Sequence, residues 1–307
     1  MCVAGVGCAL PSPRAAAPGT AARFRFDWQP PCRVPVTEHI DRDGQRAVYG
    51  YDVVLTATRD PELLEVRTDH FRPIEVNDLP SNRVGGVGER QMQIALAAAL
   101  PVLRVARDGA FVDMLGEQEL VERMLEMSGV AEGSPAASEM RRVLTSPLMM
   151  ATLRERAGDT WRGWVGAWVG LTLAPGEALD GVEELPVPGG TLRAPVRYRR
   201  DELSSLSAQR ARMTRIATLA GPEVEAFLAS VLIGVGRATG RPFTADLVQS
   251  ARRTTTMTAD TDPATLRPDV TSFSTETELD VKGEAPRTQR QVRGTNFDWA
   301  HARGCGR

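Results

Sequence analysis

The chain has very little lysine: Lys282 is the only one among 37 lysine and arginine residues. A lysine that forms a Schiff base or acts as a general base usually depends on burial, which lowers the pKa of its ammonium group. Lys282 instead lies in a polar Val-Lys-Gly-Glu stretch that is typical of a hairpin turn. The sequence therefore argues against lysine-based catalysis.

Net charge and long apolar runs are lacking as well. The formal net charge is −2, whereas an electrostatic nucleic-acid binder usually carries a strong basic excess. No apolar run approaches the roughly 18–20 residues that a membrane-spanning helix needs. We therefore expect no nucleic-acid partner and no transmembrane span.

Motifs for metals and cofactors are missing too. The histidines are His39, His70 and His301, and they show no HxH or HExxH spacing. The glycine-rich stretch 85–88 precedes a helical pattern, but it lacks the Gly-Lys-Ser/Thr ending of a phosphate-binding loop. We expect no metal site and no cofactor.

The four cysteines, Cys2, Cys8, Cys32 and Cys305, all lie near the ends of the sequence, and none forms a CxxC pair. This pattern fits a secreted protein with at most one disulfide, and it also fits a cytosolic protein with free thiols. Residues 1–22 are small, apolar or Pro-rich without periodicity, and we expect a flexible leader or the remnant of a signal.

Alternating and 3.6-residue patterns divide the rest of the chain into strands and helices. Strands come first, helices cluster in the middle, and strands return, which favours a single α+β domain over 23–307. The expected fold is a curved, mostly antiparallel sheet with helices packed on one face. Strands are predicted at 24–28, 34–38, 47–58, 63–66, 71–76, 102–106, 110–114, 171–173, 185–187, 190–199, 211–219, 247–257, 270–281 and 288–299, and helices at 89–100, 118–127, 134–144, 146–168 and 223–238.

Three of the five tryptophans, Trp161, Trp164 and Trp168, share one face of a predicted helix. Such a stripe is either ordinary core packed against the sheet or the wall of an apolar pocket, because tryptophan offers a large surface and one hydrogen-bond donor. These residues are our candidate ligand-binding side chains. His70, beside Asp69, is the first candidate for acid–base chemistry if the protein is an enzyme.

The sequence Phe-Asp-Trp occurs at 26–28 and again at 297–299, and each copy is followed within a few residues by a cysteine. We expect the two terminal strands to lie in the same sheet, so that the ends close one domain. Neighbouring strands could bring Cys32 and Cys305 within disulfide distance. The alternative is two unrelated strands with free thiols.

The Val6-Gly7-Cys8 stretch is similar to the end of a bacterial lipoprotein signal, which implies lipidation of Cys8. Together with the order of elements, it resembles the lipoprotein-carrier architecture of the bacterial envelope. That resemblance implies an envelope or secreted protein, with a lipid anchor, that binds a lipid or other hydrophobic ligand without catalysis. The alternatives are an enzyme acting on a hydrophobic small molecule, a protein-interaction module, and a cytoplasmic location.

Overall fold

The computed structural model describes residues 21–76, 79–80, 101–127, 131, 133–187, 190–201, 210–239, 244 and 246–306. The predicted leader up to residue 20, with Cys8, and the predicted helix 89–100 lie outside the described residues.

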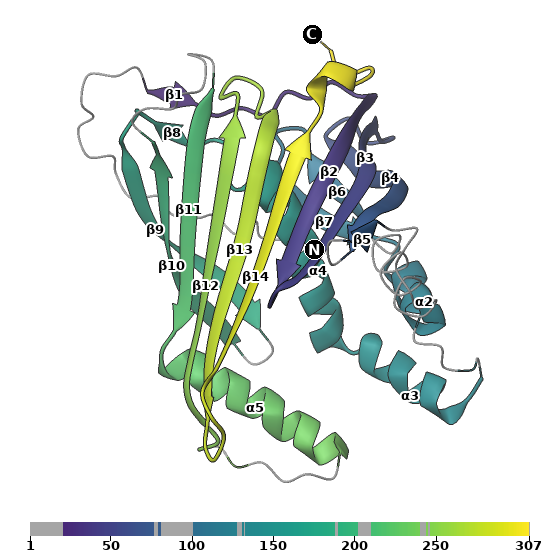
Figure 1. Cartoon of the computed structure of the whole chain (residues 1–307), viewed down its shortest axis with the longest axis vertical. Coiled ribbons are helices and arrows are strands. Elements are labelled where there is room, and N and C mark those ends of the chain that lie inside the picture. The colour runs from purple at the N-terminus through teal and green to yellow at the C-terminus, as the bar shows by residue number, and fades with distance from the viewer. Residues whose placement is uncertain are drawn as a thin grey trace.

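One large antiparallel sheet dominates the fold, and it is open, with β7 and β9 as its edge strands (Figure 1). Its strand order is β7-β6-β4-β3-β2-β14-β13-β12-β11-β10-β9, and β5 pairs with β4. The large, mostly antiparallel sheet is as predicted. The strands are β2 (Cys32–Arg42), β3 (Gln45–Ala57), β4 (Leu63–Val76), β5 (Leu79–Pro80), β6 (Val102–Ala106), β7 (Phe111–Leu115), β9 (Ala178–Val187), β10 (Gly190–Arg200), β11 (Ala211–Ala220), β12 (Val248–Thr261), β13 (Pro268–Val281) and β14 (Arg287–Phe297).

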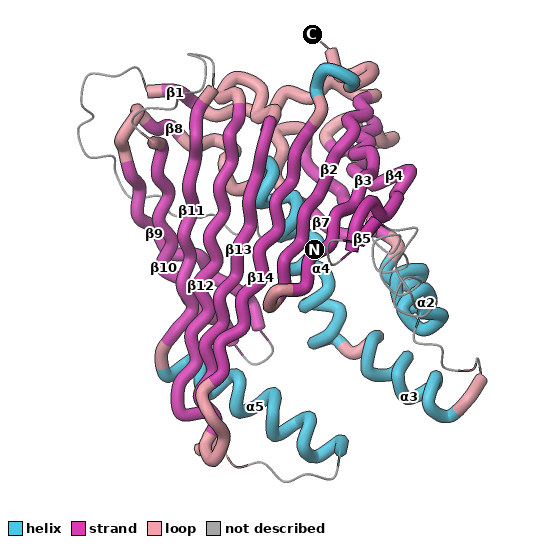
Figure 2. The backbone as a smooth tube through the Cα atoms, in the orientation of Figure 1, coloured by secondary structure: helices cyan, strands magenta, loops and turns pink. Residues whose placement is uncertain are grey.

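The α-helices that the structure describes occupy two parts of the chain (Figure 2). Between β7 and β9 lie α2 (Glu117–Met127), α3 (Pro135–Leu144), α4 (Pro147–Trp161) and a π-helix, η2 (Arg162–Gly166). Between β11 and β12 lies α5 (Pro222–Thr239), and a short 3₁₀ helix, η3 (Trp299–His301), follows β14. Ser134 and Ser146 cap α3 and α4 by accepting hydrogen bonds from backbone N–H groups, which explains where these helices begin.

The two faces of the sheet follow from the alternation of side chains along each strand. We call the inner face the one whose side chains, such as Val34, Met213 and Phe297, pack with the tryptophans of α4 and η2 in the main hydrophobic cluster. The opposite, outer face carries mostly polar and charged residues, including cross-strand pairs such as Arg193 with Glu184.

Two apolar clusters cover different ends of the inner face. The aromatic core contains Trp28, Trp161, Trp164 and Trp168 together with residues of β2, β3, β12 and β14. The α5 cluster combines Val224 and Ala229 of α5 with buried side chains of β10 and β12. The π-helix contacts β12 and β13, and α5 contacts β11 and β12.

The two chain ends meet, but not through the predicted terminal strand: segment 24–28 lies outside the large sheet, and the adjacent β1 (Ala22–Arg23) belongs to a separate two-stranded sheet. Strand β14 pairs with β2, and a disulfide joins Cys32 to Cys305. Trp28 lies edge-to-face with Phe297 and Trp299, with ring centroids 6.3 and 5.0 Å apart. The aromatic residues of the two Phe-Asp-Trp copies therefore belong to one cluster, in which the two chain ends pack together.

Two strand predictions were wrong in detail. The segment 24–28 alternates between buried and exposed residues, but only Ala22–Arg23 form a strand, β1, which pairs with β8 (Thr172–Leu173). The rest of the segment hydrogen-bonds to a loop, with the N–H of Arg25 donating to Pro263 and that of Asp27 to Thr265. A loop cannot offer a regular ladder, so periodic burial here does not imply a strand.

The predicted strands 63–66 and 71–76 form one strand, β4. The chain passes through His70 at a φ of 51°, and the pairing register with β3 shifts nearby. A local left-handed residue lets the strand continue after a bulge instead of ending.

Candidate functional site

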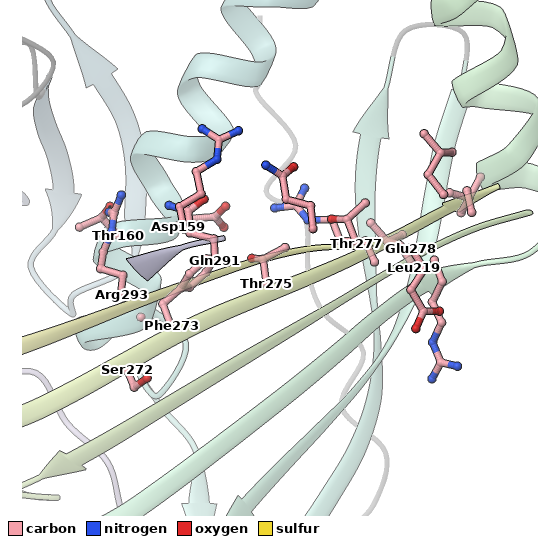
Figure 3. A pocket seen from close by; sticks show the side chains of 18 of the residues that line it. Asp159, Thr160, Leu219, Ser272, Phe273, Thr275, Thr277, Glu278, Gln291 and Arg293 are labelled. Carbon is pink, nitrogen blue, oxygen red and sulfur yellow. The ribbon is translucent and has the colours of Figure 1, made fainter. Parts of the chain in front are cut away.

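A cleft of about 520 Å³ lies between the inner face of the sheet, the junction of α4 with the π-helix, and α5 (Figure 3). Its floor consists mainly of β12, β13 and β14. The residues around it are Arg42, Asp159, Thr160, Gly163, Trp164, Leu192, Leu219, Val224, Phe227, Leu228, Ala251, Arg252, Arg253, Thr271, Ser272, Phe273, Thr275, Thr277, Glu278, Leu279, Gln289, Gln291, Arg293 and Thr295.

Polar side chains form the centre of the floor. Gln291 stands opposite Arg42 on one side and Thr275 on the other, so these three make one row across β2, β14 and β13. The next row is Gln289, Thr277 and Arg253, which are likewise opposite one another. We call these two rows the polar floor. It offers hydroxyl and guanidinium donors and the Gln291 amide, whereas the Gln289 amide donates to the Asp43 carboxylate at 3.3 Å.

An apolar wall adjoins the polar floor. It consists of Val224, Phe227 and Leu228 of α5 and, from the sheet, Ala251 and Leu279. Arg253 also stands opposite Leu219, another residue of the α5 cluster. The passage from a polar to an apolar lining therefore takes place within two residues along β12.

At the other end of the cleft, the charges have partners. Arg293 donates from Nη1 to the Thr160 hydroxyl at 3.0 Å, and its Nε lies 2.8 Å from Oε1 of the buried Glu38. Glu38 also accepts a hydrogen bond from the Tyr51 hydroxyl at 2.7 Å. Burial, with the nearby Glu38, raises the pKa of Tyr51 well above its usual value. This network fixes Arg293 between the sheet and α4.

The polar floor differs from this end of the cleft because its two arginines have no ion-pair partner in the part of the chain that the structure describes. Among the described residues, neither Arg42 nor Arg253 forms an ion pair, and the buried hydroxyl of Thr275 has no hydrogen-bond partner. Asp159 is paired with Arg162 at 2.8 Å. The polar floor is thus positively charged and has unused hydrogen-bonding capacity.

A buried ion pair lies near the border between the aromatic core and the cleft. Arg215 binds Glu183 through two guanidinium nitrogens, and the Tyr198 hydroxyl donates to the same carboxylate at 3.0 Å. Burial first, and the Glu183 charge second, raise the pKa of Tyr198 to about 12. Tyr198 also meets Trp168 edge-to-face.

The three candidate tryptophans have different surroundings. Trp161 and Trp168 are fully buried in the aromatic core, and their indole N–H groups donate to the carbonyls of Gly109 and Gly163. Trp164 is also buried, yet it lines the cleft. Ligand binding by these residues stays a prediction.

His70 lies on the outer face, away from the tryptophans, because its partners Arg33 and Asp52 alternate with core residues of β2 and β3. Burial works to raise the pKa of Asp52, but hydrogen bonds from Arg33 and His70 outweigh it, so the pKa lies below its usual value. Arg33 also binds Asp69. Within the described part of the chain, no group of three or more His, Cys, Asp or Glu residues is placed to hold a metal ion.

The sequence did not single out the polar floor. Its members except Arg42 lie in predicted strands, and those strands carry polar residues on both faces; Arg42 lies beyond the predicted strand 34–38, at the end of the longer strand β2. Polarity alone therefore could not say which side chains point inward. The register in which the strands pair decides which side chains face the cleft, and this register is known only from the folded sheet.

Comparisons with known proteins assign the chain to no family. No family model and no curated protein matches the chain. It is similar to a solved structure described as "lipid-protein interactions in lipovitellin", with 9% sequence identity over 92% of this chain and a TM-score of 0.44. The match spans only 26% of that chain, about a quarter of its length. A likeness at that score establishes neither a shared fold nor a shared ligand. Among the described residues, no helix is long and apolar enough to cross a membrane.

Proposed function

We propose that the protein binds a lipid or another amphiphilic small molecule in the cleft, without catalysis. The observation behind this proposal is the apolar wall of α5 beside the polar floor, in a cleft of about 520 Å³. Clefts of this size that combine apolar walls with a few polar groups are typical of small-molecule sites. In this proposal, a curved sheet with helices packed on one face serves as the ligand-binding framework.

The residues around the cleft support binding more than catalysis. The described lining contains neither histidine nor cysteine, and Asp159 and Arg293 are engaged with Arg162 and Glu38. His70, the acid–base candidate, is on the outer face. An interaction module would need a broad apolar surface, whereas the apolar side chains near the cleft converge on α5.

We further propose that the protein works in the bacterial cell envelope or outside the cell. The Cys32–Cys305 disulfide supports this, because stable disulfides are mainly found in oxidising compartments. Alkylation of free thiols in freshly lysed producing cells, followed by mass spectrometry, tests it. Bonded cysteines in the exported fraction are expected, and reduced cysteines confined to the cytoplasm would contradict the proposal.

Titration with the fluorescent fatty acid cis-parinaric acid tests the binding proposal. Thr275→Trp fills the centre of the cleft, and Ser274→Trp adds the same bulk on the outer face, at the adjacent position of β13. We expect saturable binding to the full chain, about tenfold weaker in Thr275→Trp and unchanged in Ser274→Trp.

A second pair, Gln291→Phe in the cleft and Val292→Phe outside it, covers the case in which Thr275→Trp does not fold. Absence of saturable binding to the full chain would overturn the proposal. Equal affinities for the inner and outer variants would do the same, because binding would then lie elsewhere.

A further inference from the structure

We infer that the ligand carries an anionic head group, a carboxylate or a phosphate, which binds to the polar floor beside Arg42 and Arg253 while the apolar chain lies against α5. This inference rests on the proposed function and specifies its ligand class. It follows from the charge, the hydrogen-bonding capacity and the position of the apolar wall.

The charged side chains that line the cleft predict the sign of the charge on the ligand's head group. Arg293 is neutralised by Glu38, and Asp159 by Arg162. Arg252 and Glu278 also border the cleft, but they stand opposite each other at positions that alternate with the inward Ala251 and Leu279, so their side chains belong to the outer face. The inner charges without an ion-pair partner among the described residues are Arg42 and Arg253. Both are cationic, so the cleft favours an anion.

The hydrogen-bonding groups of the polar floor also favour an anionic head group. Gln291 and Thr275 lie between the two arginines in the strand order, and Figure 3 shows both side chains on the floor of the cleft. The Thr275 hydroxyl is buried without a partner. A buried donor left unsatisfied is costly, and an oxygen of a carboxylate or phosphate removes that cost. Arg42 and Arg253 are separated by about 16 Å, from three strand spacings and an offset of two residues along the strands, so a head group between them lies within the field of both.

The apolar wall sets the direction of the chain. Along β12, Arg253 is followed toward the start of the strand by Ala251, which packs with Phe227 and Leu279 in the α5 cluster. A head group at Arg253 therefore places its hydrocarbon chain next to α5. Burying that chain and pairing the head group require one molecule with both parts, which is an acidic amphiphile.

Isothermal titration of the full chain with four C12 probes tests this inference, each below its micellar concentration. The probes are dodecanoate, dodecyl phosphate, dodecanol and dodecyltrimethylammonium. We expect both anions to bind about tenfold more tightly than dodecanol, with an advantage that falls as salt is added. The ratio between the two anions identifies whether the site prefers a carboxylate or a phosphate.

Variants of the arginines test whether the preference for anionic probes arises at the polar floor. Arg42→Gln/Arg253→Gln should bring the anions to within about twofold of dodecanol, whereas Arg290→Gln, on the outer face of β14 next to Gln291, should keep the preference. If the double variant does not fold, each single variant is expected to lose part of the preference. Equal binding of dodecanol and the anions, tighter binding of the cation, or an unchanged preference in the double variant would overturn the head-group inference and leave the proposed function standing. Failure of all four probes to bind would overturn both.

Discussion

The two ends of the inner face share strands β10 to β13 but are filled differently. At one end, Trp161 and Trp168 are fully buried among aromatic neighbours, and their N–H groups have partners. At the other end, α5 covers smaller apolar residues, and the cleft between α5 and the π-helix keeps about 520 Å³ unfilled. Close-packed regions hold a structure together, whereas hollow ones hold a ligand.

Strand β13 shows how a single element serves both ends. Its inward residues run from Phe273, which packs on the aromatic core, through Thr275 and Thr277 on the polar floor, to Leu279 of the α5 cluster. The change in side-chain size and polarity every second residue creates the cleft without any break in the hydrogen-bonded ladder. The contrast between the two ends thus depends on side chains alone.

Truncating a large side chain at each end is expected to give the largest difference in the free energy of unfolding between the two ends. Trp161→Ala should lower the free energy of unfolding by about 3–5 kcal/mol, because it removes a fully buried side chain and leaves the Gly109 carbonyl without its donor. Phe227→Ala, at the partly buried α5 wall, should cost about 1–2 kcal/mol. Urea unfolding followed by circular dichroism measures both. Equal losses would show that the α5 end is as tightly packed as the aromatic core.

The disulfide should have the next largest effect, confined to the filled end. Cys32→Ser/Cys305→Ser is expected to cost about 2–4 kcal/mol, because the bond restricts the unfolded chain over a separation of 273 residues. Hydrogen exchange should rise mainly in β2 and β14, while amides of α5 keep their protection relative to the global stability. Increased exchange limited to α5 would contradict this division.

Removing the unpartnered hydroxyl should stabilise the hollow end. Thr275→Val is expected to raise the free energy of unfolding by about 1 kcal/mol in the absence of ligand, since a methyl group needs no hydrogen bond. Thr256→Val is the matched control, because Thr256 pairs with the exposed Ile216 on the outer face. Thermal unfolding measures the pair. A loss of stability in Thr275→Val would show that the hydroxyl has a partner in solution.

The smallest effect at neutral pH concerns the tyrosine at the border. The folded pKa of Tyr198, about 12, lies above the unfolded value of about 10. Its contribution to stability is therefore complete below pH 10 and is lost as the pH rises through 12. Tyr198→Phe should make stability fall less steeply over that range. Spectrophotometric titration of the folded protein should also show phenolate appearing late, because the pKa values of Tyr49 and Tyr51 are raised too. Ionisation of a tyrosine near pH 10 before unfolding would contradict this.

Much of the sheet could be predicted because strand periodicity and turn residues are local signals. The β2–β3 hairpin, the β6–β7 hairpin and the long strands β12 to β14 all follow from alternation and from turns marked by glycine or proline. The meeting of the chain ends was predicted from a short repeated aromatic triplet, because a large aromatic at both ends needs a common place to be buried.

The site could not be predicted in the same way. Arg42 and Arg253 are far apart in sequence, and they share a cleft only through the register of four strands. The tryptophan stripe was the most visible local signal, yet two of its three members are buried in the core, and Trp164 alone of the three lines the cleft. His70 was conspicuous for its neighbour Asp69, but alternation and a bulge place it on the outer face.

The pairing of β2 with β14 has a consequence for folding speed. From this central pair, one half of the chain extends strand by strand to the β7 edge and the other to the β9 edge. A circular permutant that linked residue 306 to residue 21 and began at β9 would meet the strands of the large sheet in nearly their spatial order. The contacts between β2 and β14 would then join residues close in sequence, as those of the other strand pairs already do, and chains with local contacts fold faster. The natural order instead leaves the central pair to be formed between strands that are made first and last.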